Sequence, residues 1–193
     1  MAKVGVLALQ GDFEAHKKAL ERAGATAVPV RSVAELDGLD GLIVPGGEST
    51  TILKLLREES MFEPLRAFGT RKPMFGTCAG AILMAKEVFN PVQESLALCD
   101  LRIERNAYGR QLQSLVTKLR PEVEFGGKPG GAEFEAVFIR APIIRSLSDD
   151  AKILARYNGD PVLVEQGRHL IATFHPELTH DPRVHERFLR NLQ

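Results

Sequence analysis

One cysteine of the chain lies in a pattern typical of a nucleophile on a sharp turn. Residues 76–80 read Gly-Thr-Cys-Ala-Gly, which is the nucleophile elbow G-x-S-x-G with Cys78 in place of serine. The glycines permit a tight strand-to-helix turn that presents the side chain at the start of a helix. A helix start stabilises a negative charge by only ~0.3–1 kcal/mol, whereas one pKa unit is ~1.4 kcal/mol. Cys78 therefore needs a partner base, and the packing of a small apolar residue is the alternative role.

His175 is the histidine best placed to be that base. It follows the apolar residues 170–174 and precedes Pro176, so we expect it at the carboxyl edge of a sheet, where α/β proteins hold their sites. Glu177 lies two residues later, and in an extended segment both side chains leave the same face. A carboxylate at that position would orient the imidazole. A solvated strand end is the alternative for this pair.

The other histidines carry weaker signals. His16, His180 and His185 lie in segments with helical patterns, where we expect them to be exposed to solvent. His169 begins an apolar strand and has no acidic neighbour in a useful register.

A second glycine-rich stretch could supply hydrogen-bond donors to the reaction. Residues 45–49, Pro-Gly-Gly-Glu-Ser, follow another apolar run. An acyl transfer needs backbone donors where the oxyanion forms, typically worth ~3–4 kcal/mol. We expect the N–H groups of Gly47 and Ala79 to form this oxyanion hole. A tight turn capped by Ser49 is compatible with that role and is also the alternative to it.

Apolar strands alternate with amphipathic helices in the first half of the chain, which predicts a parallel sheet covered by helices on both faces. The expected strands are residues 4–9, 27–30, 41–45 and 73–76, and the expected helices are 13–23, 49–58, 61–68 and 79–86. Further strands are expected at 101–104, 112–119, 136–139, 153–157, 162–166 and 170–174, and a closing helix at 181–192. Few helices separate these later strands, so several should be antiparallel. The predicted fold class is α/β, with three layers, a mostly parallel central sheet and some antiparallel strands in the second half.

Length and composition limit the class of protein. The chain has 193 residues, which predicts a single domain over 1–193, with residues 126–131 as a flexible loop inside it. Its 25 basic and 25 acidic residues give zero net charge, which argues against a domain that neutralises nucleic-acid phosphates. Two cysteines, Cys78 and Cys99, exclude a disulfide scaffold, and we expect Cys99 to be structural. The apolar residues 4–9 are too short for a signal peptide or a membrane span, so we expect a cytoplasmic protein.

The elbow around Cys78 and the His-Pro-Glu motif at 175–177 resemble those of class I, triad-type glutamine amidotransferases. From Gly5 to the final helix, the chain also resembles the glutaminase subunits of pyridoxal 5'-phosphate synthases. The stretches that carry this resemblance are residues 9–11, 45–51, 74–80, 104–111, 138–142 and 174–179.

The resemblance implies a role for each site residue. Cys78 is the nucleophile that attacks the side-chain amide of glutamine, His175 is the general acid and base, and Glu177 orients His175. The positions that bind glutamine in the family correspond to Gly47, Glu48, Ser49, Arg105, Ile139 and Arg140. The implied partner is the synthase subunit, which makes pyridoxal phosphate from a pentose phosphate, a triose phosphate and ammonia in a large hetero-oligomer. No cofactor, metal, nucleic acid or membrane is expected to take part.

Gln10 and Gly11 follow the first strand, near the expected site. We expect them to sense the partner or to shape the oxyanion loop, and a plain strand-to-helix turn is the alternative.

Three other functions remain open at the level of the sequence. One is a glutaminase serving another pathway, such as histidine biosynthesis. Another is a cysteine peptidase or hydrolase on a similar fold, and the third is a catalytically silent regulatory subunit.

Overall fold

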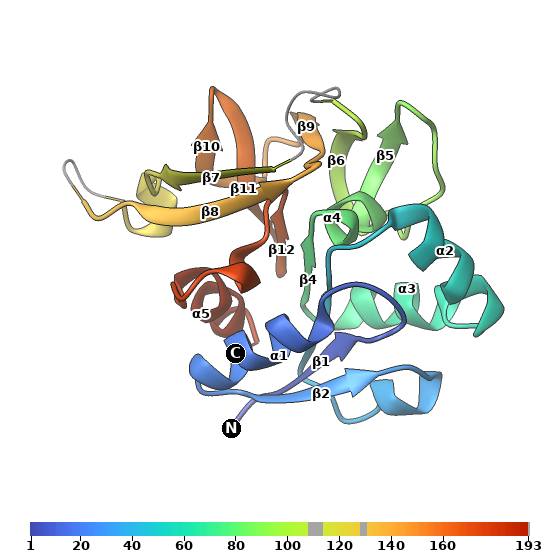
Figure 1. Cartoon of the computed structure of the whole chain (residues 1–193). Helices are drawn as coiled ribbons and strands as arrows, with labels where there is room; N and C mark the ends of the chain where they lie inside the picture. The colour runs from blue at the N-terminus through green and yellow to red at the C-terminus, as the bar shows by residue number, and fades with distance from the viewer. Residues whose placement is uncertain (108–113, 128–130, 193) are drawn as a thin grey trace.

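A mostly parallel sheet forms the centre of the computed structural model (Figure 1). The structure describes residues 1–107, 114–127 and 131–192. Strands β2, β1, β3, β4 and β12 run parallel, and β11 and β10 add antiparallel strands at one edge, in the order β10-β11-β12-β4-β3-β1-β2. These strands are β1 (Lys3–Leu7), β2 (Thr26–Val30), β3 (Gly41–Val44), β4 (Met74–Thr77), β10 (Lys152–Tyr157), β11 (Asp160–Gln166) and β12 (His169–Ala172).

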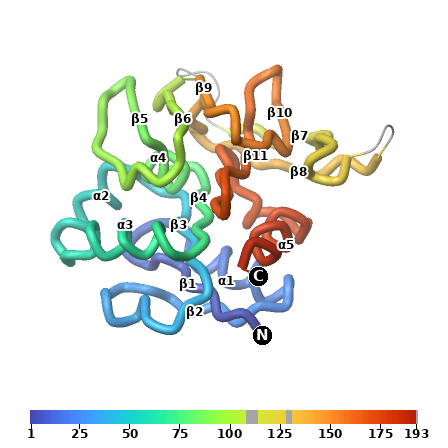
Figure 2. The backbone as a smooth tube through the Cα atoms, turned by 180° about the vertical axis from the view of Figure 1, so that it is seen from behind, coloured from blue at the N-terminus to red at the C-terminus, as the bar shows by residue number. Residues whose placement is uncertain are grey.

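Helices cover both faces of this sheet. The alternation of strand side chains divides the core, because Val4 and Val6 of β1 point to one face and Leu7 to the other. Helices α1 (Phe13–Arg22) and α5 (Arg183–Arg190) pack on the first face, beside both chain termini (Figure 2). The second face carries α2 (Ser49–Glu58), α3 (Phe62–Arg71) and α4 (Ala79–Met84).

Two small sheets lie along the upper edge of the molecule in Figure 1. One pairs β6 with β5 in parallel and with β9 in antiparallel orientation, and the other is the antiparallel pair of β7 and β8. Their bounds are β5 (Ala85–Phe89), β6 (Cys99–Glu104), β9 (Ile143–Leu147), β7 (Ser114–Leu119) and β8 (Phe134–Ile139). Short 3₁₀ turns complete the chain: η1 (Val33–Leu36), η3 (Val123–Phe125) and η4 (Pro176–Leu178).

The predicted α/β class and the mixed sheet are confirmed, and most element ends differ from the prediction by a few residues. The helix expected at 79–86 stops at Met84, and the chain continues directly as β5, which pairs with β6. Strands β5 and β9 were not predicted. The start of the strand expected at 112–119 and residues 128–130 of the expected glycine-rich loop lie outside the described residues.

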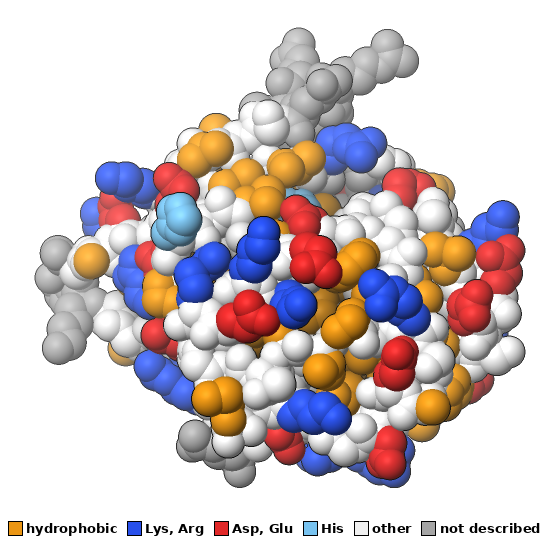
Figure 3. Space-filling view, turned by 60° about the horizontal axis from the view of Figure 1, so that its bottom comes forward, with side chains coloured by type: hydrophobic (Ala, Val, Ile, Leu, Met, Phe, Trp, Pro, Cys, Tyr) orange, Lys and Arg blue, Asp and Glu red, His pale blue; other side chains and the backbone are white. Residues whose placement is uncertain are grey.

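The surface in Figure 3 carries side chains of both charge signs, interspersed with apolar ones. This distribution agrees with the zero net charge of the chain. Among the helices of the described residues, none is long and apolar enough to cross a membrane.

Helix α4 rests directly on β3, because Gly80 has no side chain. A Cβ atom at Gly80 would lie 1.9 Å from the carbonyl oxygen of Val44, which is rigid strand backbone. This contact sets the distance between the central sheet and the helix that follows Cys78.

We expect Gly80→Ala to lower the free energy of unfolding by ~1–3 kcal/mol, the usual cost of overpacking, although alanine normally stabilises a helix relative to glycine. Urea denaturation measures this difference. Gly69→Ala in α3 is the matched control, because its Cβ would meet flexible side chains of Leu98 and Met74 instead of backbone. A Gly80→Ala protein as stable as the wild type would contradict the close-contact argument.

Candidate functional site

Cys78 occupies a strained turn between β4 and α4. Its backbone has φ +47° and ψ −102°, a conformation that costs a non-glycine residue about 1–3 kcal/mol. The N–H of Cys78 donates to the carbonyl of Ala172 at 2.9 Å, which ties the turn to β12. The Sγ atom lies 3.7 Å from the carbonyl oxygen of Ile139. The turn is thus held on two sides, and it has the geometry expected of a nucleophile elbow.

His175 and Glu177 follow β12 and meet as predicted, on a different backbone. The N–H of His175 donates to the carbonyl of Val137 in β8 at 2.8 Å. Glu177 lies in the 3₁₀ turn Pro176–Leu178, so the expected extended segment is wrong. Because the turn curls the chain back, Glu177 Oε1 still lies 2.7 Å from His175 Nδ1.

The electrostatics favour a protonated imidazole beside the cysteine. Burial lowers the pKa of His175, but hydrogen bonds to Cys78 and Glu177 and the charges of these groups outweigh burial and raise that pKa to about 10. Burial acts to raise the pKa of Glu177, but the hydrogen bond and the positive charge of His175 hold it below the usual value. An ionised carboxylate, an imidazolium and the sulfur atom of Cys78 therefore follow one another at the site.

The loop after β3 packs against the side chains of Cys78 and His175. A Cβ at Gly46 would lie 2.4 Å from His175 Cε1 and 3.3 Å from Cys78 Cβ. Only a glycine allows the backbone to approach the two reactive side chains so closely.

A cavity of about 230 Å³ opens in front of Cys78 and His175. The structure brings together in its wall all the positions expected to bind glutamine, together with Gln10 and Ala79: Gly47, Glu48, Ser49, Arg105, Ile139 and Arg140. Sequence reasoning did not single out three further lining residues, Ile82, Asn106 and Pro142. Glu177 stands behind His175, and Gly11 packs against the carbonyl of Gly46.

Strained backbone gathers at this cavity. Three of its non-glycine residues, Cys78, Asn106 and Arg140, have positive φ angles of 47°, 46° and 44°. Such residues cluster at functional sites, where the surroundings hold them in place.

Side chains also fix the loop at residues 46–49. Gln10 Oε1 accepts a hydrogen bond from the N–H of Glu48 at 2.9 Å. Ser49 Oγ donates to Gln93 Oε1 at 2.9 Å. Both contacts tie the candidate oxyanion loop to neighbouring segments.

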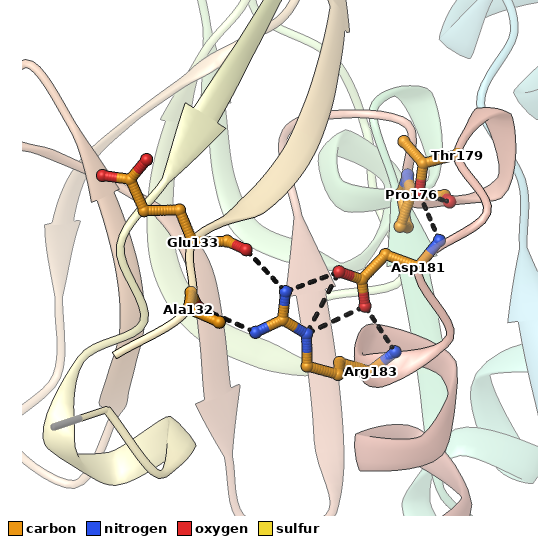
Figure 4. A network of polar contacts seen from close by, with 6 residues as sticks. All are labelled: Ala132, Glu133, Pro176, Thr179, Asp181 and Arg183. Carbon is orange, nitrogen blue, oxygen red and sulfur yellow. Dashed lines mark hydrogen bonds and ion pairs between the residues drawn. The ribbon is translucent and has the colours of Figure 1, made fainter. Parts of the chain in front are cut away.

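An arginine anchors the turn that carries Glu177 (Figure 4). Arg183 donates to the carboxylate of Asp181 and to the carbonyls at positions 132 and 133, at 2.9 and 2.8 Å for the carbonyls. The Asp181 N–H donates to Thr179 Oγ1, which in turn donates to the carbonyl of Pro176 at 3.1 Å. These contacts fasten the 3₁₀ turn to the segment that precedes β8.

The expectation that His16 and His185 are exposed is wrong, because both are completely buried. His16 lies four residues before the buried Leu20 in α1, and His185 three residues before the buried Phe188 in α5. This spacing places each histidine on the apolar face of its helix. The spacing was the sequence signal from which their burial could have been predicted.

The remaining candidates lie apart from the cavity. His180 is exposed. Burial lowers the pKa of His169 to about 4, and its Nδ1 accepts from the N–H of Met74. Burial raises the pKa of Cys99 to about 12, which keeps this thiol protonated. Residues 108–111 of the motif at 104–111 lie outside the described residues.

Comparisons with known proteins agree with one another. The profile of the SNO glutamine amidotransferase family matches residues 6–193. The curated "Pyridoxal 5'-phosphate synthase subunit PdxT" of Solibacter usitatus is 61% identical over 192 residues and covers 100% of both chains. That of Koribacter versatilis is 55% identical over 188 residues, 97% of this chain and 94% of the relative. A solved structure described as "Crystal structure of glutamine amidotransferase" has a TM-score of 0.88 at 49% identity and covers 98% of each chain. PurLQS from Thermotoga maritima, 17% identical with a TM-score of 0.70, covers 100% of this chain and 99% of its own and shares the fold.

We expect Glu177→Gln to lower the pKa of His175 from about 10 toward the ordinary value near ~6.5. The substitution removes the negative charge that favours the imidazolium, so His175 would lose its proton at a lower pH. Nuclear magnetic resonance titration of the histidine ring measures the shift. Glu35→Gln, which changes an exposed carboxylate far from the site, is the control. An unchanged titration of His175 would contradict the assignment of Glu177 as its charge partner.

Proposed function

Because this chain belongs to the SNO glutamine amidotransferase family, we propose that it is the glutaminase subunit of a pyridoxal 5'-phosphate synthase. The relatives that carry this subunit name match the chain along its full length. The observation that supports this reaction is the succession of contacts from Cys78 to His175 and from His175 to Glu177, with Cys78 and His175 in the wall of the cavity.

The reaction follows from this succession of contacts. The Cys78 thiolate attacks the side-chain amide carbon of glutamine, and the imidazolium of His175 gives its proton to the departing ammonia. A glutamyl thioester remains on Cys78. His175 then takes a proton from water, which attacks the thioester, releases glutamate and restores the thiolate. Glu177 stays ionised and keeps the imidazole ring oriented.

Backbone donors stabilise the oxyanion in this proposal. The N–H of Ala79 lies in the first turn of α4, where backbone donors lack intrahelical acceptors. The N–H of Gly47 comes from the loop that packs on Cys78 and His175. Each such donor is typically worth ~3–4 kcal/mol in the transition state.

Charged groups around the cavity suit the two ends of glutamine. The guanidinium groups of Arg105 and Arg140 match an α-carboxylate in shape and charge, and the carboxylate of Glu48 matches an α-ammonium. Ser49 and Ile139 are further residues of the wall.

A second subunit uses the ammonia. In neutral water, ammonia becomes ammonium and loses the lone pair that a nucleophile needs. Transfer inside a complex avoids this loss. The partner in this proposal is the synthase subunit, and the two assemble into a large hetero-oligomer.

Gln10 shapes the oxyanion loop in this proposal. Its Oε1 holds the N–H of Glu48, directly after Gly47, while Gly11 supports the carbonyl of Gly46 from behind. These contacts restrain the peptide groups that face the reacting carbonyl.

We expect the chain to release glutamate from glutamine weakly alone and strongly with the synthase subunit. Cys78→Ala should reduce release roughly 1,000-fold or more, as removal of a nucleophile does in related mechanisms. Cys99→Ala is the matched control. A glutamate assay under both conditions measures the effect. Release retained by Cys78→Ala, or stimulation only by the synthase of another pathway, would contradict the proposal.

We expect Gln10→Ala to lower kcat of the complex about tenfold, because a lost hydrogen bond of ~1.4 kcal/mol has that effect. Gln10→Glu, which keeps an acceptor oxygen, should retain more activity. Sedimentation of the mixed subunits shows whether binding to the synthase is unchanged. If Gln10→Ala keeps full kcat, the role in shaping the loop is wrong.

A further inference from the structure

A buried polar network lies behind Glu177, and the proposed mechanism does not use it. His16 from α1 and His185 from α5 meet with 3.1 Å between Nδ1 of the first and Nε2 of the second. The Nε2 atom of His16 lies 3.0 Å from Thr77 Oγ1 and 3.3 Å from Glu177 Oε2. One imidazole therefore bridges the residue before the nucleophile and the carboxylate of the triad.

The surroundings keep both rings uncharged. Each histidine ring makes a T-shaped contact with Phe75, and the ring centroids lie 6.1 Å apart for His16 and 5.8 Å apart for His185. For His16, burial and the charge of His175 lower the pKa, and they outweigh the carboxylates of Glu177 and Asp12. Burial also lowers the pKa of His185 to about 3; His16 and Arg22 act in the same direction and Glu177 in the opposite one.

Hydrogen bonding then selects one tautomer for each ring. His16 Nε2 makes its hydrogen bond to Thr77 Oγ1 and also lies 3.3 Å from Glu177 Oε2. Because an ionised carboxylate only accepts hydrogen bonds, a proton on Nε2 is the tautomer that suits both oxygens. Nδ1 of His16 is then an acceptor and takes the N–H of His185 Nε2. The opposite tautomer would set a lone pair of His16 against a carboxylate oxygen.

Glu177 Oε2 requires such a donor. It is fully buried, and among the described residues it has no hydrogen-bond partner. A buried acceptor without a partner is costly, and a charged one more so. His16 Nε2 lies 3.3 Å from this oxygen, and the other oxygen lies 2.7 Å from His175 Nδ1.

We propose that His16, held in one tautomer by His185, is a positioning residue of the triad Cys78, His175 and Glu177. It fixes Glu177 Oε2 so that Oε1 faces His175. This inference rests on the proposed function, because it assigns His16 to the same reaction. His16 does not touch the substrate. It acts by preventing rotation of the carboxylate and by keeping the carboxylate ionised next to the imidazolium.

The test compares His16→Leu with His16→Gln in the complex with the synthase subunit. Leucine removes the donor, and kcat should fall roughly tenfold to a hundredfold, the range for one hydrogen bond to a charged group, with KM for glutamine unchanged. In His16→Gln, the side-chain amide N–H of the introduced residue can replace the imidazole Nε2–H. This variant should therefore recover much of kcat. Leu20→Ala perturbs the same buried face of α1 without removing a polar group and should leave kcat of the folded protein unchanged.

A second readout needs neither glutamine nor the partner. In His16→Leu, alkylation of Cys78 should slow severalfold relative to the wild type, whereas in Leu20→Ala it should stay near the wild-type rate. Mass spectrometry assigns the label to Cys78 and not to Cys99. The alkylation readout does not depend on glutamine. If the wild-type protein fails to hydrolyse glutamine, the proposed function is wrong, and the alkylation rates still test the role of His16.

Full kcat and an unchanged alkylation rate in His16→Leu would overturn the inference. The inference would also be overturned if the losses of kcat in His16→Leu and Leu20→Ala were both proportional to their losses in the free energy of unfolding. If His16→Leu does not fold, His185→Leu and His185→Gln provide the test. His185→Leu removes the donor that keeps His16 in one tautomer, so it should lower kcat. His185→Gln keeps a donor to His16 Nδ1, so it should lower kcat less. Equal kcat in these two variants would also overturn the inference.

Discussion

The buried charge of Glu177 is the constraint on which the candidate site depends. Moving a carboxylate from water into a protein interior costs several kcal/mol unless partners compensate. Glu177 has no exposed side-chain surface, and its two oxygens face His175 and His16. The stabilised carboxylate in turn raises the pKa of His175, and in the proposed mechanism the resulting imidazolium supports Cys78 as the nucleophile.

The sheet brings these groups together from distant parts of the chain. Strands β4 and β12 are parallel neighbours, with Ala172 opposite Thr77. The residues after these two strand ends, Cys78 and His175, therefore emerge at the same edge. Helices α1 and α5 cover one face of the sheet and place His16 and His185 beneath that edge. The same packing that buries the apolar side chains thus supplies the polar support of the carboxylate.

Much of this arrangement could be predicted from local patterns. Apolar runs at β1, β3 and β4 indicate a buried parallel sheet, and motifs after strand ends locate Cys78 and His175. The adjacency of β4 and β12 could not be predicted, because it depends on non-local pairing. The unbroken apolar run from Ala79 to Ala85 gave no signal for the end of α4. His16 and His185 were misjudged because a polar residue type outweighed their position on the apolar face of a helix.

A neutral donor is better suited than a cation to the position of His16. A lysine or arginine there would pair with Glu177 and reduce the negative potential at His175, which would weaken the imidazolium. In the proposed arrangement, a neutral His16 with Nε2 3.3 Å from Glu177 Oε2 leaves most of the carboxylate charge to act on His175. Burial against Phe75 keeps His16 and His185 uncharged. The apolar environment of the pair therefore protects the one charge interaction that the nucleophile requires.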